Sequence, residues 1–173
     1  MTSGKSTIGP IVANVHGWEF VDLDRAIENR EQKSVVEIFE QNGEEYFRNL
    51  EHELLAEFSK SENLVIALGG GTMAHKRNLD ILKNSGTIVY LRSSPEMIYK
   101  RLRNKIDRPI FRDLVLSGNS KPKDFIDRIK KLMNEREPFY SQADIYINTD
   151  ETPIGITVDK LVNLLKRGGN EKN

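Results

Sequence analysis

The chain lacks cysteine altogether, has no excess of charge of either sign and contains no long hydrophobic run. The missing cysteines exclude a disulfide framework and thiolate chemistry. Because 26 lysines and arginines balance 26 aspartates and glutamates and aromatic residues make up only 8%, nucleic acid is a poor candidate partner. No apolar run reaches the roughly 20 residues that span a membrane, and no signal peptide precedes the first motif. We therefore expect a cytoplasmic protein that binds neither nucleic acid nor membrane.

The composition predicts one globular domain covering residues 1–173, with 38% apolar and 30% charged residues. Short apolar runs alternate with longer amphipathic segments; the runs are residues 18–22, 63–68, 87–91 and 144–147. Buried runs separated by helical segments indicate a parallel sheet with helices on both faces. The expected fold class is therefore α/β, in three α/β/α layers.

Helix signals lie between these runs. Ser34 and Glu37 fit a capping box, and Gly43 is placed to end the helix that this box begins. Residues 44–58 carry apolar side chains at the three-to-four spacing of a helix face, namely Phe47, Leu50, Leu54 and Phe58. Further helices are expected from Ser94-Pro95, over 124–140 and over 157–167, with kinks at Pro10 and Pro138. The irregular segment 106–122 is long enough to predict a functional loop.

Half of a phosphate-binding loop is also missing. The pattern G-x-x-x-x-G-K-[ST] needs a glycine five positions before Gly4, ahead of Met1, and a strand in front of that glycine. The remaining half still predicts an anion site, because N–H groups at a helix start attract phosphate. Lys5 would reach the β- and γ-phosphates of ATP, and the Ser6 hydroxyl would bind Mg²⁺. The alternative is a chance GKST at a chain end. We expect the natural chain to start upstream, with an apolar strand and a glycine there.

Two acids and three glycines follow predicted strands, at the sheet edge where ligands bind in open α/β folds. Asp22 and Asp24 stand in FVDLD, so one carboxylate can join the Mg²⁺ shell while the other accepts a proton from a substrate hydroxyl. Asp24 could instead only cap the next helix. The glycines in LGGGT at 68–72 would let backbone approach a ligand, or simply make a turn.

Three arginines are candidates for binding anions. Arg48 in YFRNLE and Arg136 in REPFY would hold a small carboxylate, because a guanidinium fork matches a carboxylate at two points. Arg108 in RPIF would neutralise charge in a transition state beside the phosphates. Solvated arginines on helix surfaces are the alternative for each.

Together these segments resemble the shikimate kinase family over nearly the whole chain. The similar stretches, in order, are GKSTIG, FVDLDRAIE, SVVEIFEQNGEEYFRNLE, LGGGT, RPIF and REPFYSQAD. The resemblance implies a five-stranded parallel sheet of the P-loop kinase type, of which the first strand is absent from this chain. It also implies transfer of the γ-phosphoryl group of ATP to the 3-hydroxyl of shikimate, with Mg²⁺, in a monomer. A substrate-binding segment at about 23–58 and a lid at about 106–122 are implied as well.

The resemblance assigns roles residue by residue. Nucleotide binding is implied for Thr2, Ser3, Gly4, Lys5, Ser6, Thr7, Arg108 and Thr152. Shikimate binding is implied for Asp24, Arg48, Gly70, Gly71 and Arg136. Ser6 and Asp22 would hold the metal, and Lys5, Asp24 and Arg108 would be catalytic, with Asp24 as the base. Arg101 or Arg103 would stack on adenine.

Two other functions fit parts of the pattern. Another small-molecule kinase of this fold, such as a gluconate kinase, shares the phosphate loop but not the constellation of Asp24, Arg48, Gly70 and Arg136. A non-catalytic nucleotide-binding module would explain the incomplete loop, although the retained Lys5 favours an enzyme.

Overall fold

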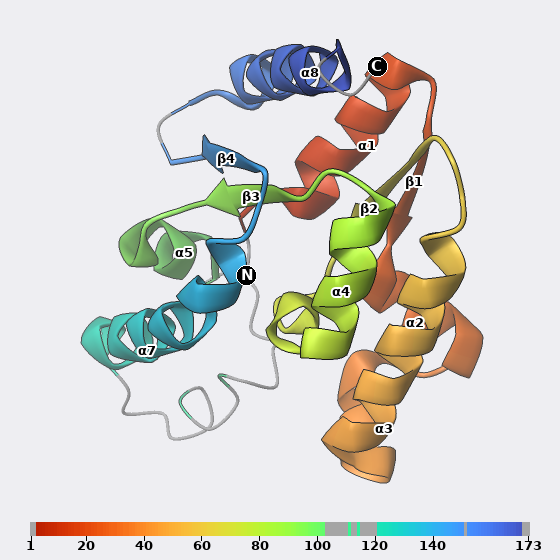
Figure 1. Cartoon of the computed structure of the whole chain (residues 1–173). Helices are drawn as coiled ribbons and strands as arrows, with labels where there is room; N and C mark the ends of the chain where they lie inside the picture. The colour runs from red at the N-terminus through yellow and green to blue at the C-terminus, as the bar shows by residue number, and fades with distance from the viewer. Residues whose placement is uncertain (1–2, 103–110, 112–113, 115–120, 151, 171–173) are drawn as a thin grey trace.

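The structure is a computed structural model that describes residues 3–102, 111, 114, 121–150 and 152–170. Helices and short parallel strands alternate along the chain (Figure 1). In order the elements are α1 (Lys5–His16), β1 (Glu19–Asp22), α2 (Leu23–Glu31), α3 (Val35–Phe58), β2 (Leu64–Ala67), the 3₁₀ helix η1 (Thr72–Ala74), α4 (Lys76–Ser85), β3 (Val89–Arg92), α5 (Pro95–Leu102), α7 (Pro122–Tyr140), β4 (Ile145–Asn148) and α8 (Ile154–Asn170). In the described part of the chain, no helix is both long and apolar enough to cross a membrane.

The four predicted strands are all present and parallel, but they form two separate pairs. β1 pairs with β2, with Glu19 opposite Leu64, and β3 pairs with β4, with Val89 opposite Ile145. Each pair is a two-stranded sheet, and within the described residues no ladder joins them. The prediction of parallel strands is confirmed, whereas a single continuous sheet is not observed.

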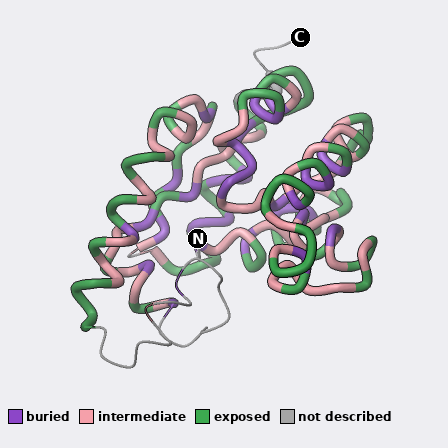
Figure 2. Tube along the Cα trace, turned by 90° about the horizontal axis from the view of Figure 1, so that it is seen from below, coloured by how far each residue is buried: buried purple, intermediate pink, exposed green. Residues whose placement is uncertain are grey.

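Helices cover both faces of the strands, which gives the predicted three layers. One apolar cluster joins α1 and α8 to β3 and β4 through residues such as Val12, Leu91 and Val158. A larger cluster on the other face joins α2, α3 and α4 through residues such as Ile27 and Leu55, both fully buried. Figure 2 shows that the buried stretches lie where the elements face one another, with exposed residues on their outer sides.

β2 and β3 each have one edge without a paired strand among the described residues, and we call these two facing edges the slot. β2 and β3 both contribute to both clusters: Val65 and Leu91 pack with α1 and α8, while Ile66 and Tyr90 pack on the opposite face. They are therefore the inner strands of the two pairs and lie in one layer. Because β2 pairs with β1 and β3 with β4, each inner strand has a second edge on which a further strand could pair.

The helix predictions hold. Ser34 and Glu37 form the capping box. The helix that they begin ends at Gly43, whose φ of 84° and ψ of 173° are not helical, and a second helix follows within α3 and continues to Phe58. α1 continues through Pro10, and α7 continues through Pro138 to Tyr140. Each proline removes only one backbone bond, and Pro138 lies in a last turn, so neither interrupts its helix.

Candidate active site

The amino-terminal end of α1 has the geometry of an anion site. Gly4 precedes the helix with a φ of 101°, a left-handed conformation that favours glycine. Its carbonyl accepts bonds from the N–H groups of Thr7 at 3.0 Å and Ile8 at 2.8 Å, which starts the helix at once. First-turn N–H groups have no partner inside a helix, and they point toward an anion placed before it. Ser3 is buried and Lys5 begins the helix, as the loop prediction requires.

A second glycine, which the sequence analysis did not single out, brings α1 against β1. A Cβ added at Gly9 would lie only 2.4 Å from the Phe20 ring. Only glycine allows this close approach without displacing the ring. The contact places the first turn of α1 beside the carboxyl end of β1.

Ser6 and Asp22 meet there, as predicted for a metal site. The Ser6 hydroxyl donates to Asp22 Oδ2 at 2.7 Å. Asp22 Oδ1 also accepts from the Arg25 N–H at 3.4 Å and caps α2, so the capping residue is Asp22 and not Asp24. A hydroxyl and a carboxylate beside a phosphate site are oxygen donors of the kind that Mg²⁺ binds. The donor set therefore fits Mg²⁺ held jointly with nucleotide phosphates.

The glycine triplet gathers the predicted substrate residues. A Cβ added at Gly69 would lie 2.8 Å from Asp24 Oδ1, and one added at Gly71 would lie 2.8 Å from Arg48 Nη2. The acid and the arginine come from α2 and α3, yet both contact one turn after β2. Backbone approach to functional side chains, and not only a tight turn, therefore requires these glycines.

Beneath Arg48 lies a buried acid that the sequence analysis missed. Glu51 is fully buried, and its Oε2 accepts from Arg48 Nη1 at 3.0 Å. Its other oxygen accepts from the buried Thr72 hydroxyl at 2.6 Å. Glu44 accepts from the Nε and Nη2 atoms of Arg48 on the outer side. The two carboxylates fix the guanidinium beside Gly71. The burial of Glu51 could have been predicted from its position, because it follows Leu50 within the apolar stripe of α3.

The REPFY segment reaches the same turn from α7. The Tyr140 hydroxyl donates to the Gly70 carbonyl at 2.5 Å. Burial raises the pKa of Tyr140 above its usual value, although the charge of the nearby Arg136 acts in the opposite direction. Tyr140 therefore brings the end of α7 that carries Arg136 close to Gly70. The sequence analysis named Arg136 and Gly70 but did not predict that Tyr140 connects them.

The predicted adenine side is built around the ends of β3 and β4. Arg101 donates to the Thr149 carbonyl at 2.6 Å and to the Ser93 hydroxyl at 3.3 Å. Although burial opposes it, bonds from the Ser93 hydroxyl and the Ser94 N–H lower the pKa of Asp150. Thr152 lies in the following loop, where its carbonyl accepts from the Thr157 hydroxyl at 3.5 Å. These contacts order the loop before α8.

Two predicted site residues, Thr2 and Arg108, lie outside the described residues, as do Arg103 and most of the predicted lid. Within segment 106–122 the structure describes Phe111, Leu114, Lys121 and Pro122; Phe111 and Leu114 pack against α5 and α7, and α7 already begins at Pro122.

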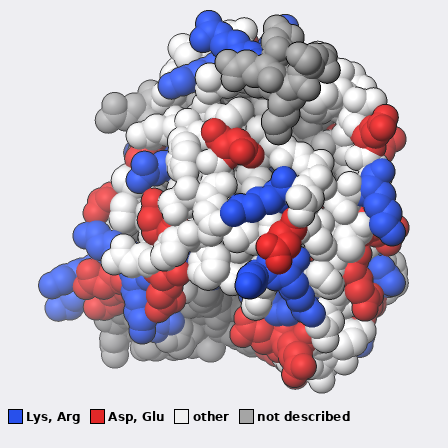
Figure 3. All heavy atoms as spheres, viewed as in Figure 1, with Lys and Arg blue, Asp and Glu red and all other residues white. Residues whose placement is uncertain are grey.

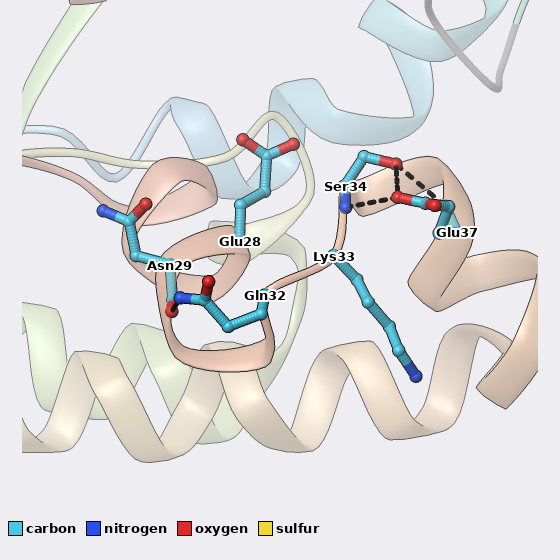
Figure 4. Close-up of a pocket in the computed structure, with 6 residues that line it drawn as sticks. All are labelled: Glu28, Asn29, Gln32, Lys33, Ser34 and Glu37. Carbon is cyan, nitrogen blue, oxygen red and sulfur yellow. Dashed lines mark hydrogen bonds between the residues drawn. The ribbon is translucent and has the colours of Figure 1, made fainter.

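Two surface features of the described residues were compared with the predicted site. On the face drawn in Figure 3, acidic and basic side chains are intermixed and do not gather into a stripe of one sign. Figure 4 shows a hollow of about 330 Å³ at the turn between α2 and α3. It is lined by Glu28, Asn29, Gln32, Lys33, Ser34 and Glu37. None of these is a predicted site residue, and the Ser34–Glu37 pair is already used as a helix cap.

The chain is similar to known proteins over nearly its whole length. A family model described as shikimate kinase matches residues 1–166. The chain is 46% identical over 170 residues to a shikimate kinase of Chloroherpeton thalassium, covering 96% of this chain and 88% of the relative. It is 42% identical over 166 residues to a shikimate kinase of Chlorobaculum tepidum, covering 95% of this chain and 86% of the relative.

Solved structures similar to this chain include further shikimate kinases. A shikimate kinase from Bacteroides thetaiotaomicron superposes with a TM-score of 0.86 at 34% identity, over 96% of this chain and 94% of the other. A shikimate kinase from Acinetobacter baumannii in complex with shikimate gives a TM-score of 0.85 at 29% identity, over 96% of this chain and 88% of the other.

Proposed function

Because the chain belongs to the shikimate kinase family, we propose that the glycine triplet, Asp24, Arg48 and Arg136 form its substrate pocket. The reaction is transfer of the γ-phosphoryl group of ATP to the 3-hydroxyl of shikimate, with Mg²⁺. The observation that carries the assignment of the pocket is the convergence of Asp24 and Arg48 on the turn after β2. The comparisons do not favour a gluconate kinase or a non-catalytic module.

Arg48 and Arg136 would hold the shikimate carboxylate, since a guanidinium and a carboxylate form paired, charge-assisted bonds. Two anchors on one end of a small ring fix which hydroxyl reaches Asp24. Gly70 and Gly71 would contact the ring hydroxyls with backbone groups. Orientation of this kind supplies much of the barrier reduction in phosphoryl transfer, because the protein does little covalent chemistry.

Asp24 would accept the proton of the 3-hydroxyl as the attacking oxygen forms its bond to the γ-phosphorus. The loop residues Thr2, Ser3, Gly4, Lys5, Ser6 and Thr7 would surround the phosphates. Lys5 would balance charge on the β- and γ-phosphates, with Arg108 joining from the lid. Mg²⁺, when bound by Ser6 and Asp22, offsets the negative charge that phosphoryl transfer moves to the leaving group. Thr152 would contact the nucleotide near Arg101.

A coupled assay of ADP release tests the function. Shikimate should stimulate ADP formation strongly, whereas gluconate and other hydroxylated acids should not, because only shikimate places a carboxylate and a hydroxyl at the required separation. Mass spectrometry should find shikimate 3-phosphate as the product. Stimulation by gluconate in place of shikimate would overturn the assignment.

Removing one of the two arginines that would hold the carboxylate should weaken the binding of shikimate much more than the binding of ATP. In Arg136→Ala we expect the KM of shikimate to rise by about 10- to 100-fold, because a bond to a charged group contributes about 1.5–3 kcal/mol. The KM of ATP should change less than threefold, roughly within the scatter of additive sites. Steady-state kinetics with each substrate varied in turn measures both. Equal losses for the two substrates would contradict this role for Arg136.

A methyl group at position 71 should act on Arg48 alone. In Gly71→Ala the added carbon would lie 2.8 Å from Arg48 Nη2, so the guanidinium must shift. We expect about a tenfold rise in the KM of shikimate, a change of about 1.4 kcal/mol, and an unchanged KM for ATP. Gly86→Ala is the matched control, because a Cβ there meets nothing within 4 Å. Equal behaviour of the two variants would argue against Arg48 as a substrate ligand.

Cytoplasmic location and action as a monomer are further parts of the proposal. The use of ATP supports the cytoplasmic location. Cell fractionation and sedimentation equilibrium, respectively, test them.

A further inference from the structure

Tyr140 connects two residues of the proposed substrate pocket that lie far apart in the sequence. It is the last residue of α7, and its hydroxyl donates to the Gly70 carbonyl, 70 positions away, at 2.5 Å. Arg136, one helical turn earlier, interacts electrostatically with the same phenol. The bond from Tyr140 to Gly70 therefore brings the end of α7 that carries Arg136 to the glycine turn.

The ring of Tyr140 is held independently of its hydroxyl. It packs against the Tyr90 ring, with centroids 4.8 Å apart and planes inclined by 44°. It also belongs to the partly buried shell of the main apolar cluster, beside Phe139 and Leu68. The burial of the ring keeps the phenol neutral at ordinary pH, so its proton remains available to donate.

The bond to Gly70 fixes a peptide group that glycines would otherwise leave free to rotate. In a trans peptide the N–H points opposite to the C=O of the same unit. Holding the Gly70 carbonyl toward Tyr140 therefore turns the Gly71 N–H away from Tyr140. Because Gly70 and Gly71 both lack a Cβ, no side chain hinders rotation of this unit, and the phenol supplies the restraint.

We propose that Tyr140 is a positioning residue, whose hydroxyl holds the 70–71 peptide next to Arg136 and so keeps the two in register, which forms the shikimate pocket before substrate arrives. This inference rests on the proposed function. It assigns Tyr140 no contact with substrate and no part in proton transfer. A pocket ordered in advance binds more tightly, since less ordering remains to be done on binding.

The test is Tyr140→Phe in the full chain, which removes the hydroxyl and keeps the ring. We expect the KM of shikimate to rise by about tenfold, since the Gly70 carbonyl loses its partner and the 70–71 peptide loses its restraint. Tyr140 would act on the binding of shikimate and not on the reacting groups. The KM of ATP should therefore stay unchanged, and kcat should fall by less than about threefold. Tyr146→Phe is the matched control: its hydroxyl donates to the Ser141 carbonyl at 2.7 Å on the surface, and its ring packs edge-on against Tyr90.

An unchanged KM for shikimate in Tyr140→Phe would overturn the inference, as would equal rises for shikimate and ATP, which indicate general loosening. A double-mutant cycle with Arg136→Ala gives a second measurement. If Tyr140 acts through Arg136, the double variant should raise the KM of shikimate by less than the product of the two single effects. A full product would contradict the link. If the unsubstituted chain fails to phosphorylate shikimate, the proposed function fails instead, and the two failures are therefore distinguishable.

Discussion

Asp24→Asn is expected to bind ATP normally and to lose nearly all turnover. The amide has almost the same shape as the carboxylate, but it cannot accept the proton of the 3-hydroxyl. Loss of a general base lowers kcat by about 10²–10⁴-fold. The residue stands in the first turn of α2, beside Gly69, and so on the side of the glycine triplet. The coupled assay gives kcat, and calorimetric titration gives the dissociation constant of ATP.

Asp80→Asn is the matched control for this substitution. Asp80 is an exposed acid in the middle of α4 and is not one of the predicted site residues. It should leave both kcat and ATP binding unchanged. If Asp24→Asn turned over like Asp80→Asn, the carboxylate would have no role in proton transfer, and positioning by Arg48 and Arg136 would have to account for the rate.

Filling the slot between β2 and β3 with an added strand is expected to give the largest gain in stability. A strand parallel to β1 would end at the same edge as β1, beside the start of α1, and could therefore lead into Gly4. Such a strand would pair with both inner edges and bury its side chains in both apolar clusters. The experiment adds to the amino end a Val- and Ile-rich run of about five residues, the common length of a strand, and a glycine five positions before Gly4.

A net gain of about 3 kcal/mol would raise Tm by about 6–12 °C in a domain of this size. ATP should also bind at least about tenfold more tightly, because the completed loop presents more backbone N–H groups to the phosphates. A Gly- and Ser-rich extension of equal length is the control and should change neither quantity. Equal Tm values for the two extended chains would show that no strand enters the slot.

Local signals were enough to predict most of the secondary structure. The four strands follow from short apolar runs, and the start of α3 follows from Ser34 and Glu37, three residues apart. Such features depend on backbone bonds and side-chain periodicity within a few residues, which the sequence displays directly. The helix over 124–140 was predicted as well, and α7 reaches Tyr140 through Pro138, since a proline in a last turn removes only one bond.

Part of the site was predictable for the same reason. Ser6, Asp22 and the glycine triplet all follow or precede a predicted element at the sheet edge where ligands bind, and the structure brings Ser6 and Asp22 to 2.7 Å. Their order along the chain identified them before any contact was known.

What the sequence by itself determined, then, is which segments form strands and helices and which residue types stand at their ends. Only the tertiary structure decided that Glu51 is buried under Arg48, that Gly9 admits the Phe20 ring, that Tyr140 reaches Gly70 and that the strands divide into two pairs. The physical reason is the separation of the contacting residues along the chain. Glu51 and Thr72 are 21 positions apart and Tyr140 and Gly70 are 70 apart, and no local pattern encodes a partner at that distance, because packing of whole layers selects it.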